Sequence, residues 1–514
     1  MRNFLIVFIV LTTQSAIAAN SGPTVAITGG QIRGALLEKS GAVFKGIPFA
    51  RPPVGVLRWQ APLAAKPWVG VRDATAFGAV CAQNAGRYET KGSDEEDCLY
   101  LNVWTPEWPI ERWLPVMVWI HGGGNYGQSS SEIFNDGEKL ARRGVVFVSI
   151  EYRLGVFGFF AHPELTKTSR HHASGNQGVL DQIAALRWVH ANITKFGGDP
   201  ANVTIFGQSA GAVDVSVLMT SPLTKGLFRR AIAQSGAVVG LGNPETLAMA
   251  ENRGKMLAMK LKLPSTNTIE DLRALPAAAI LSVYSPQPDA LRSLDVIVDG
   301  YVFPTAPARV FAAGREHHVD LIAGSNAREQ VPGFSLSSDI KKTIGDAYGP
   351  LASRALTMYR TTDPDYGTPA EQWGTDTSFR CGSVAQMVWH VAKGNRVYEY
   401  QFSHVANGRE ALGATHGSEI SAVFGAFDHP PPLQGAPSHF TAVDERISSE
   451  MQQYWTNFAL TGNPNGGQLP SWPEFDVVSR AYIEFVDAGP VAKKGLRRPF
   501  CDLFIENVKR EMAK

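Results

Sequence analysis

Residues 207–211, Gly-Gln-Ser-Ala-Gly, constrain the fold of this chain more than any other short segment. They follow an apolar run at 203–206 and precede a helix-compatible segment at 210–219. A G-x-S-x-G between a strand and a helix is typical of a nucleophile elbow, a sharp turn that presents a serine Oγ above the edge of a sheet. A chain with 50 glycines can produce the five-residue pattern by chance, so the strand before it and the helix after it carry the prediction that Ser209 is a nucleophile.

Further apolar runs without polar alternation predict buried strands at 116–120, 145–150, 321–323 and 397–402. Such runs are typical of parallel strands that are covered on both faces. Helical patterns lie between them, and the clearest spans 178–192. This alternation predicts an α/β fold with a large, mostly parallel sheet, in which ligands bind at the carboxyl ends of the strands.

The sequence His-Gly-Gly-Gly at 121–124 follows the strand predicted at 116–120. Glycines at such a position let backbone N–H groups turn toward a bound carbonyl oxygen, where acyl transfer builds negative charge. An ordinary glycine-rich turn is the alternative. Because this motif after a strand is the form found in lipases and esterases, we interpret it as an oxyanion-stabilising loop.

A nucleophilic serine needs a base, and the base needs a carboxylate behind it, in the chain order serine, acid, histidine. His416 lies in a loop of small residues, 413–419, after a predicted strand. Glu329 lies in a loop that follows the strand predicted at 321–323. Position favours these two residues as base and acid, while surface roles for both stay open.

The first 18 residues have the features of a cleavable signal peptide. Arg2 precedes an apolar stretch at 4–11, and Ala-Ile-Ala at 16–18 is a small-x-small cleavage site. The stretch is too short to span a bilayer, although an uncleaved anchor is the alternative. We expect a secreted or periplasmic protein whose mature chain, 19–514, forms one domain, since the sequence has no repeat or long linker.

Four cysteines follow this segment, at positions 81, 98, 381 and 501. An even number behind a signal peptide indicates disulfides. Cys81 with Cys98 is the local pairing, which leaves Cys381 and Cys501, and buried free thiols are the alternative.

The charge balance is neutral, with 48 Lys and Arg against 47 Asp and Glu. It indicates neither nucleic acid nor an anionic membrane surface as a partner. No segment after the first 18 residues approaches the ~20 apolar residues of a membrane span. We expect no metal and no cofactor, because serine-based acyl transfer needs neither.

Two longer segments resemble the type-B carboxylesterase family, the group that also contains the cholinesterases. Residues 196–211, FGGDPANVTIFGQSAG, are similar to its serine signature, and residues 96–104, EDCLYLNVW, to its second signature. Similar elements run from Gly29 to Cys501. The resemblance implies an α/β-hydrolase fold, with a large, mostly parallel central sheet flanked by helices and helical insertions over the active site.

The resemblance also implies roles for individual residues. Ser209 is the nucleophile, Glu329 the acid and His416 the base of a catalytic triad that hydrolyses a small carboxylic ester through an acyl-enzyme. Two further sets are the oxyanion donors Gly123, Gly124 and Ala210 and the disulfides Cys81–Cys98 and Cys381–Cys501. A non-catalytic binding or adhesion protein of the same fold, or a thioester or amide hydrolase, is the alternative function.

Several positions depart from the cholinesterase pattern. Gln208 stands where cholinesterases have Glu, Asn125 stands where they have Phe, and no Trp lies between Cys81 and Cys98 to stack on a choline cation. A choline ester is therefore not the expected substrate.

Three residues are candidates for the substrate pocket, namely Tyr126, Gln208 and Phe424. Core packing is the alternative for the two aromatic side chains.

Overall fold

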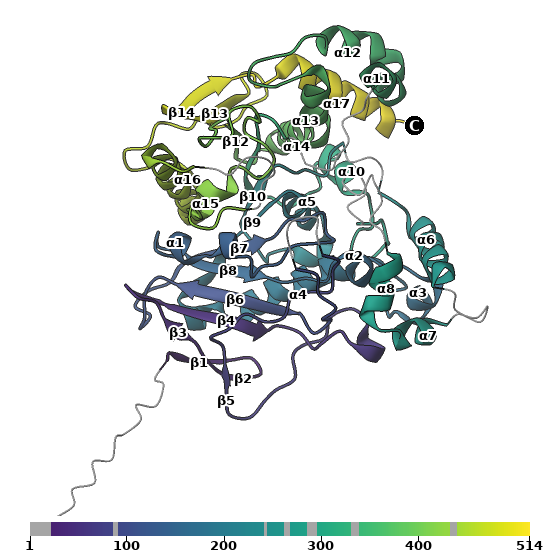
Figure 1. Ribbon diagram of the computed structural model, residues 1–514, viewed down its shortest axis with the longest axis vertical. Helices are drawn as coiled ribbons and strands as arrows, with labels where there is room; N and C mark the ends of the chain where they lie inside the picture. The colour runs from purple at the N-terminus through teal and green to yellow at the C-terminus, as the bar shows by residue number, and fades with distance from the viewer. Residues whose placement is uncertain are drawn as a thin grey trace, which may run out of the picture.

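The computed structural model describes residues 22–85, 91–240, 244–261, 268–284, 296–329, 339–431 and 439–514. The segment interpreted as a signal peptide, 1–18, lies outside these residues. Figure 1 shows one large sheet running through the molecule, from β3 and β4 in the lower half to β13 and β14 near the top.

The described residues form an 11-stranded sheet in the order β14-β13-β12-β11-β10-β9-β7-β8-β6-β4-β3. Its strands are β3 (Ala35–Leu36), β4 (Ala42–Pro48), β6 (Tyr100–Thr105), β7 (Leu114–Ile120), β8 (Val146–Ile150), β9 (Gly198–Gln208), β10 (Arg230–Gln234), β11 (Asp320–Asn326), β12 (Val397–Phe402), β13 (Ala481–Val486) and β14 (Gly489–Lys494). A second sheet holds β1 (Thr24–Ile27), β2 (Gly30–Arg33) and β5 (Val71–Asp73).

The centre of the large sheet is parallel, as predicted. Neighbouring strands from β8 through β7, β9, β10, β11 and β12 to β13 run in the same direction. Antiparallel pairs occur only towards its two edges among the described strands. The carboxyl ends of β7, β9, β10, β11 and β12 therefore lie along one edge of the sheet.

Helices cover both faces of this sheet. They are α1 (Glu138–Ala141), α2 (Gly155–Gly158), α3 (Pro163–Thr168), α4 (Gln177–Asn192), α5 (Ala210–Leu218), α6 (Leu247–Lys260), α7 (Ile269–Ala274), α8 (Ala277–Val283), α10 (Pro307–Ala312), α11 (Ile340–Tyr348), α12 (Ala352–Met358), α13 (Pro369–Thr375), α14 (Cys381–Val391), α15 (Ile420–Phe424), α16 (Ala442–Thr461) and α17 (Arg498–Met512). Each strand and helix predicted from the sequence overlaps one of these elements.

The two faces of the sheet carry separate hydrophobic clusters, because successive side chains of a strand point to opposite faces. On β7, Val118 belongs to the cluster that contains Ile183 of α4 and Val213 of α5. Its neighbour Trp119 belongs to the opposite cluster, which contains Trp455 of α16. Burial on both faces explains why these strands lack polar alternation.

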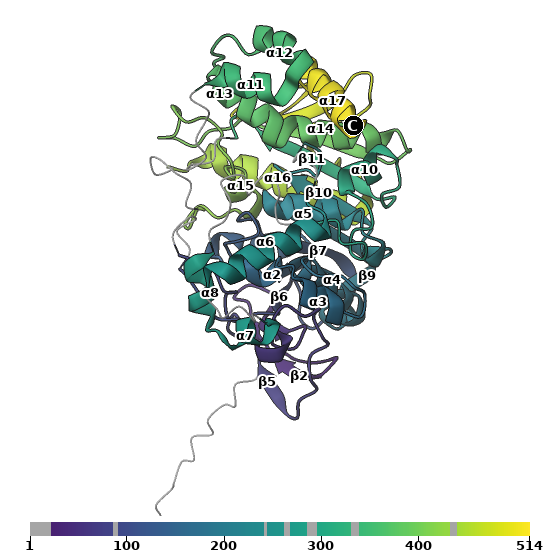
Figure 2. The same ribbon diagram turned by 90° about the vertical axis from the view of Figure 1, so that its right-hand side faces the viewer.

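Helices inserted between strands enlarge the fold. α6, α7, α8 and α10 come between β10 and β11, and α11 to α14 come between β11 and β12. Figure 2 shows α6, α7 and α8 grouped on one side of the molecule. They pack through their own apolar cluster, with Ile269, Ile280 and Phe157 among its buried members.

Both expected disulfides are present. Cys81 is bonded to Cys98, and Cys381 at the start of α14 is bonded to Cys501 of α17. The free-thiol alternative is therefore wrong for all four residues. Across the described ranges, no helix is both long enough and apolar enough to span a membrane.

Candidate active site

Ser209 lies in a sharp turn between the end of β9 and the start of α5. Its φ of 58° and ψ of −123° place a non-glycine residue in a strained region of the backbone. The neighbouring strand holds the turn in place, since the Ser209 N–H donates to the Gln234 carbonyl at 2.9 Å. The geometry agrees with the nucleophile elbow predicted from the sequence.

The elbow packs directly against the end of β7. A Cβ atom added to Gly211 would lie 2.1 Å from the carbonyl oxygen of Ile120, so only glycine permits this approach. A Cβ on Gly122 would lie 3.2 Å from the Cβ of Ser209. The glycine loop that follows β7 is consequently held beside the nucleophile.

The loop turns at Gly123, whose φ of 92° favours glycine. Its carbonyl accepts hydrogen bonds from the N–H groups of Tyr126 and Gly127, at 3.2 and 3.1 Å. The N–H groups of Gly123 and Gly124 donate to no other residue that the structure describes. Ala210 opens α5, where first-turn N–H groups have no intrahelical acceptor and the helix dipole is positive.

Glu329 and His416, 87 residues apart in the sequence, meet beyond the ends of β11 and β12. The His416 Nδ1 lies 2.7 Å from the Glu329 Oε2. The other carboxylate oxygen accepts the Asn326 N–H at 2.5 Å, and the Glu329 N–H donates to the Thr375 hydroxyl at 3.0 Å. Since Nδ1 donates its proton to Glu329, the Nε2 of neutral His416 carries a lone pair, as a general base requires.

The side-chain amide of Gln208 hydrogen-bonds to the His416 Nε2 in this structure. Its Nε2 lies 3.2 Å from the His416 Nε2, at the distance of an amide donating to an imidazole. Within the described residues, Gln208 rather than Ser209 is the hydrogen-bonding partner of this nitrogen. The candidate pocket residue Gln208 thus contacts His416, the candidate base.

Asn326 and Glu419, which were not predicted from the sequence, lie beside the contact between Glu329 and His416. The Asn326 amide donates to the Thr415 carbonyl at 2.7 Å and to the Glu419 carboxyl at 2.6 Å. Burial, together with the nearby charge of Glu329, raises the pKa of Glu419 to about 7. Both residues are polar and lie in the segments around Glu329 and His416, which is the sequence feature that could have identified them.

The two aromatic pocket candidates occupy different environments. Phe424 is 2% exposed and packs edge-on against Trp119 at 4.9 Å between ring centroids. This packing favours the core alternative for Phe424. Tyr126 is 9% exposed and lies against the glycine loop, since a Cβ on Gly124 would be 2.4 Å from its ring. Phe379, which was not a candidate, lies 4.6 Å from the His416 ring.

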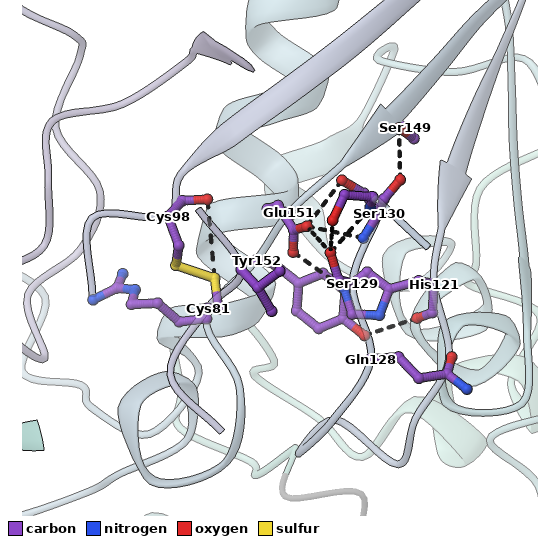
Figure 3. Close-up of polar contacts among 12 residues, drawn as sticks. Cys81, Cys98, His121, Gln128, Ser129, Ser130, Ser149, Glu151 and Tyr152 are labelled. Carbon is purple, nitrogen blue, oxygen red and sulfur yellow. Dashed lines mark hydrogen bonds and ion pairs between the residues drawn. A yellow bond between two sulfur atoms is a disulfide. The ribbon is translucent and has the colours of Figure 1, made fainter. Parts of the chain in front are cut away.

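A buried polar layer supports the start of the glycine loop at 121–124 (Figure 3). The rings of His121 and Tyr152 stack at 4.5 Å, and the Tyr152 hydroxyl donates to the His121 carbonyl at 2.8 Å. The Glu151 carboxylate accepts from the Ser129 hydroxyl at 2.5 Å and from the Ser130 N–H at 2.9 Å. These contacts fix the backbone on both sides of the glycines.

In the described part of the chain, no three His, Cys, Asp or Glu side chains are grouped so that they could hold a metal ion.

Comparisons with known proteins agree with this geometry. The family described as the carboxylesterase family matches residues 21–504. Fumonisin B1 esterase of Sphingopyxis macrogoltabida is 35% identical over 452 residues, which cover 84% of this chain and 81% of the relative. The medium-chain fatty acyl-CoA hydrolase precursor of Anas platyrhynchos is 34% identical over 548 residues, with coverage of 97% and 93%. A solved PNB esterase has a TM-score of 0.83 and 30% identity, with coverage of 94% and 99%.

Proposed function

Because this chain belongs to the carboxylesterase family and hydrolyses carboxylic esters, we propose that it does so through an acyl-enzyme on Ser209. The observation that carries the proposal is the 2.7 Å contact between His416 and Glu329 beside the nucleophile elbow. It joins a base of the correct tautomer to a buried carboxylate, as a serine nucleophile needs.

In the acylation step, the hydroxyl of Ser209 replaces the Gln208 amide as the hydrogen-bond donor to the His416 Nε2. The Oγ attacks the carbonyl carbon of the ester while His416 takes the hydroxyl proton. The carbon–oxygen bond to the alcohol then breaks, and His416 returns the proton to the departing alcohol. Glu329 keeps the imidazole in place and stabilises its charged form.

Deacylation repeats the sequence with water as the nucleophile. His416 takes a proton from the water as the water oxygen attacks the acyl carbon. The bond between that carbon and the Ser209 Oγ then breaks, His416 returns the proton to the Oγ, and a free carboxylic acid leaves. In both steps the N–H groups of Gly123, Gly124 and Ala210 are the proposed donors to the oxyanion, where each is worth roughly 3–4 kcal/mol in comparable sites.

Thioester hydrolysis is the second candidate, favoured by the similarity to a relative named as a fatty acyl-CoA hydrolase. The same triad and oxyanion loop accept either acyl donor, because both reactions pass through a tetrahedral oxyanion. The alternative of a non-catalytic binding protein disagrees with membership of the carboxylesterase family and with the hydrogen-bonded His416 and Glu329.

The test is hydrolysis of p-nitrophenyl esters from acetate to palmitate, and of a medium-chain acyl-CoA, by the wild type and by Ser209→Ala. We expect turnover by the wild type and a loss of about 10⁴- to 10⁶-fold in kcat for the variant. Ser282→Ala is the matched control, since its exposed hydroxyl donates to the Ala279 carbonyl within α8. Activity in Ser209→Ala would contradict the role of Ser209 as the nucleophile. A folded wild type that is inactive on every substrate would favour a non-catalytic binding function.

We also propose that residues 1–18 are removed, and that residues 19–514 act as a single domain outside the cytoplasm. Two disulfides support this, because such bonds persist in oxidising compartments. N-terminal sequencing of the protein recovered from the periplasm or the medium should begin near Ala19. Retention of Met1 in that fraction would refute the cleavage.

A further inference from the structure

Asn125, directly after the oxyanion loop, is fully buried and has an unusual backbone. Its φ of 61° lies in the left-handed region, and its carbonyl accepts the Gly155 N–H at 2.6 Å. Its amide oxygen lies 3.0 Å from the Tyr152 hydroxyl. Its amide nitrogen donates to the Asp214 carboxylate at 3.2 Å.

Asp214 is the partner of Asn125 on α5, four residues after Ala210 at the start of that helix. Four residues are about one helical turn, so both residues lie on the same face of α5. The Asp214 side chain is fully buried, and its second oxygen accepts the Gln182 amide at 2.6 Å. Burial raises the pKa of this carboxyl to about 6, so the fold retains the group despite an energetic cost.

The hydrogen bond between Asn125 and Asp214 spans the two halves of the oxyanion hole. Gly123 and Gly124 come from the loop after β7, whereas Ala210 comes from α5. An oxyanion donor is effective when it is held about 2.7–3.1 Å from the developing charge. Glycines restrain their own backbone weakly, so a loop of glycines needs an external anchor to keep that geometry.

We propose that Asn125 and Asp214 are positioning residues that hold the glycine loop and the start of α5 in the register required for oxyanion stabilisation. The inference rests on the proposed acyl-enzyme mechanism and adds to it a side-chain link between the two sets of donors. Tyr152, which contacts both Asn125 and the His121 carbonyl, fixes the other end of the same link.

Three variants separate this role from general stability. Asn125→Gly removes the amide but keeps a residue that tolerates the positive φ. Asp214→Ser removes the carboxylate from the same link. The exchange Asn125→Asp with Asp214→Asn reverses the hydrogen bond, because the amide introduced at position 214 donates to the carboxylate introduced at position 125. The oxygen of that amide still accepts from Gln182.

Each single variant should lower kcat for p-nitrophenyl acetate by about 10- to 100-fold with KM changed less than twofold, since the donors act on the transition state. The affinity for a trifluoromethyl ketone, which adds to Ser209 and forms an oxyanion, should fall by the same factor. The exchange should recover at least half of the lost activity on a logarithmic scale.

Asn192→Ser is the control, because Asn192 is also buried and its side chain accepts from the backbone N–H of Thr28 at 2.8 Å, in the turn between β1 and β2. It should lower Tm without changing kcat or ketone affinity. The proposal is wrong if Asn125→Gly and Asp214→Ser lower Tm but leave kcat and ketone affinity unchanged. It is also wrong if the kcat of the exchange variant is no higher than the combined losses of the two single variants predict. Either result leaves the Ser209→Ala test of the mechanism unaffected.

Discussion

At the scale of single residues, Asn326 connects the segments that carry the proposed acid and base. Its backbone N–H holds one oxygen of Glu329, while its side chain holds the carbonyl of Thr415, the residue before His416. The same amide also contacts the buried Glu419. One residue at the end of β11 therefore contacts both Glu329, the proposed acid, and the loop that carries His416, the proposed base.

Asn326→Ala should lower kcat about tenfold while KM stays within twofold, because a loosened His416 loop weakens proton transfer rather than binding. Steady-state kinetics on p-nitrophenyl acetate measure the effect. Asn457→Ala, which removes a side-chain bond from α16 to the Pro464 carbonyl, is the control and should leave kcat unchanged. An unchanged kcat in Asn326→Ala would show that the backbone N–H of residue 326 is enough to position Glu329 and that the side chain is not needed.

At the scale of elements, the site depends on how closely the end of β7 approaches the start of α5. The contact between Gly211 and the Ile120 carbonyl leaves no room for a side chain. The strand edge supplies the glycine loop, and the helix supplies Ser209 at its N-cap and Ala210 in its first turn. Their separation decides whether the proposed oxyanion donors and Ser209, the proposed nucleophile, face the same carbonyl group.

Gly211→Ala should separate these two elements, lowering kcat at least tenfold and the free energy of unfolding by about 1–3 kcal/mol through overpacking. Gly345→Ala on α11 is the matched control, because nothing lies within 4 Å of the added Cβ. This second change should raise the free energy of unfolding by about 0.5–1 kcal/mol. Denaturant unfolding and kinetics on both variants provide the comparison. Normal activity in Gly211→Ala would mean that catalysis tolerates a larger separation between the end of β7 and the start of α5.

At the scale of the whole molecule, several carboxyl groups are buried away from water. Burial raises the pKa of Glu399 on β12 to about 8, and that of Glu419 to about 7. In the native state these groups stay protonated at pH values where the unfolded chain has lost their protons. Their contribution to stability is therefore complete below about pH 4.5 and is lost as the pH rises through the folded pKa values.

Glu399→Gln should flatten the pH dependence of stability. From pH 5 to pH 8 the free energy of unfolding of the wild type should fall by on the order of 3 kcal/mol relative to that of the variant. The reason is that each pKa unit corresponds to about 1.4 kcal/mol. Thermal unfolding at both pH values gives the measurement, with the difference in Tm between variant and wild type larger at pH 8. A difference independent of pH would mean that Glu399 is ionised in the folded protein.

The sequence by itself determined the elements and the local chemistry of this protein. Parallel strands buried on both faces leave continuous apolar runs, and the elbow at Ser209 requires glycine where backbones nearly touch, so residue type reveals both. The pairing of Cys81 with Cys98 was also predictable as the local choice.

Only the tertiary structure decided which distant side chains meet. His416 and Glu329 were candidates by position, but their contact depends on β11 and β12 being neighbours in the sheet. The place of Gln208 on the imidazole and the link from Asn125 to Asp214 depend on side-chain directions across elements. A sequence records local backbone requirements through residue type, whereas contacts between remote residues follow from strand order and packing, which no single segment encodes.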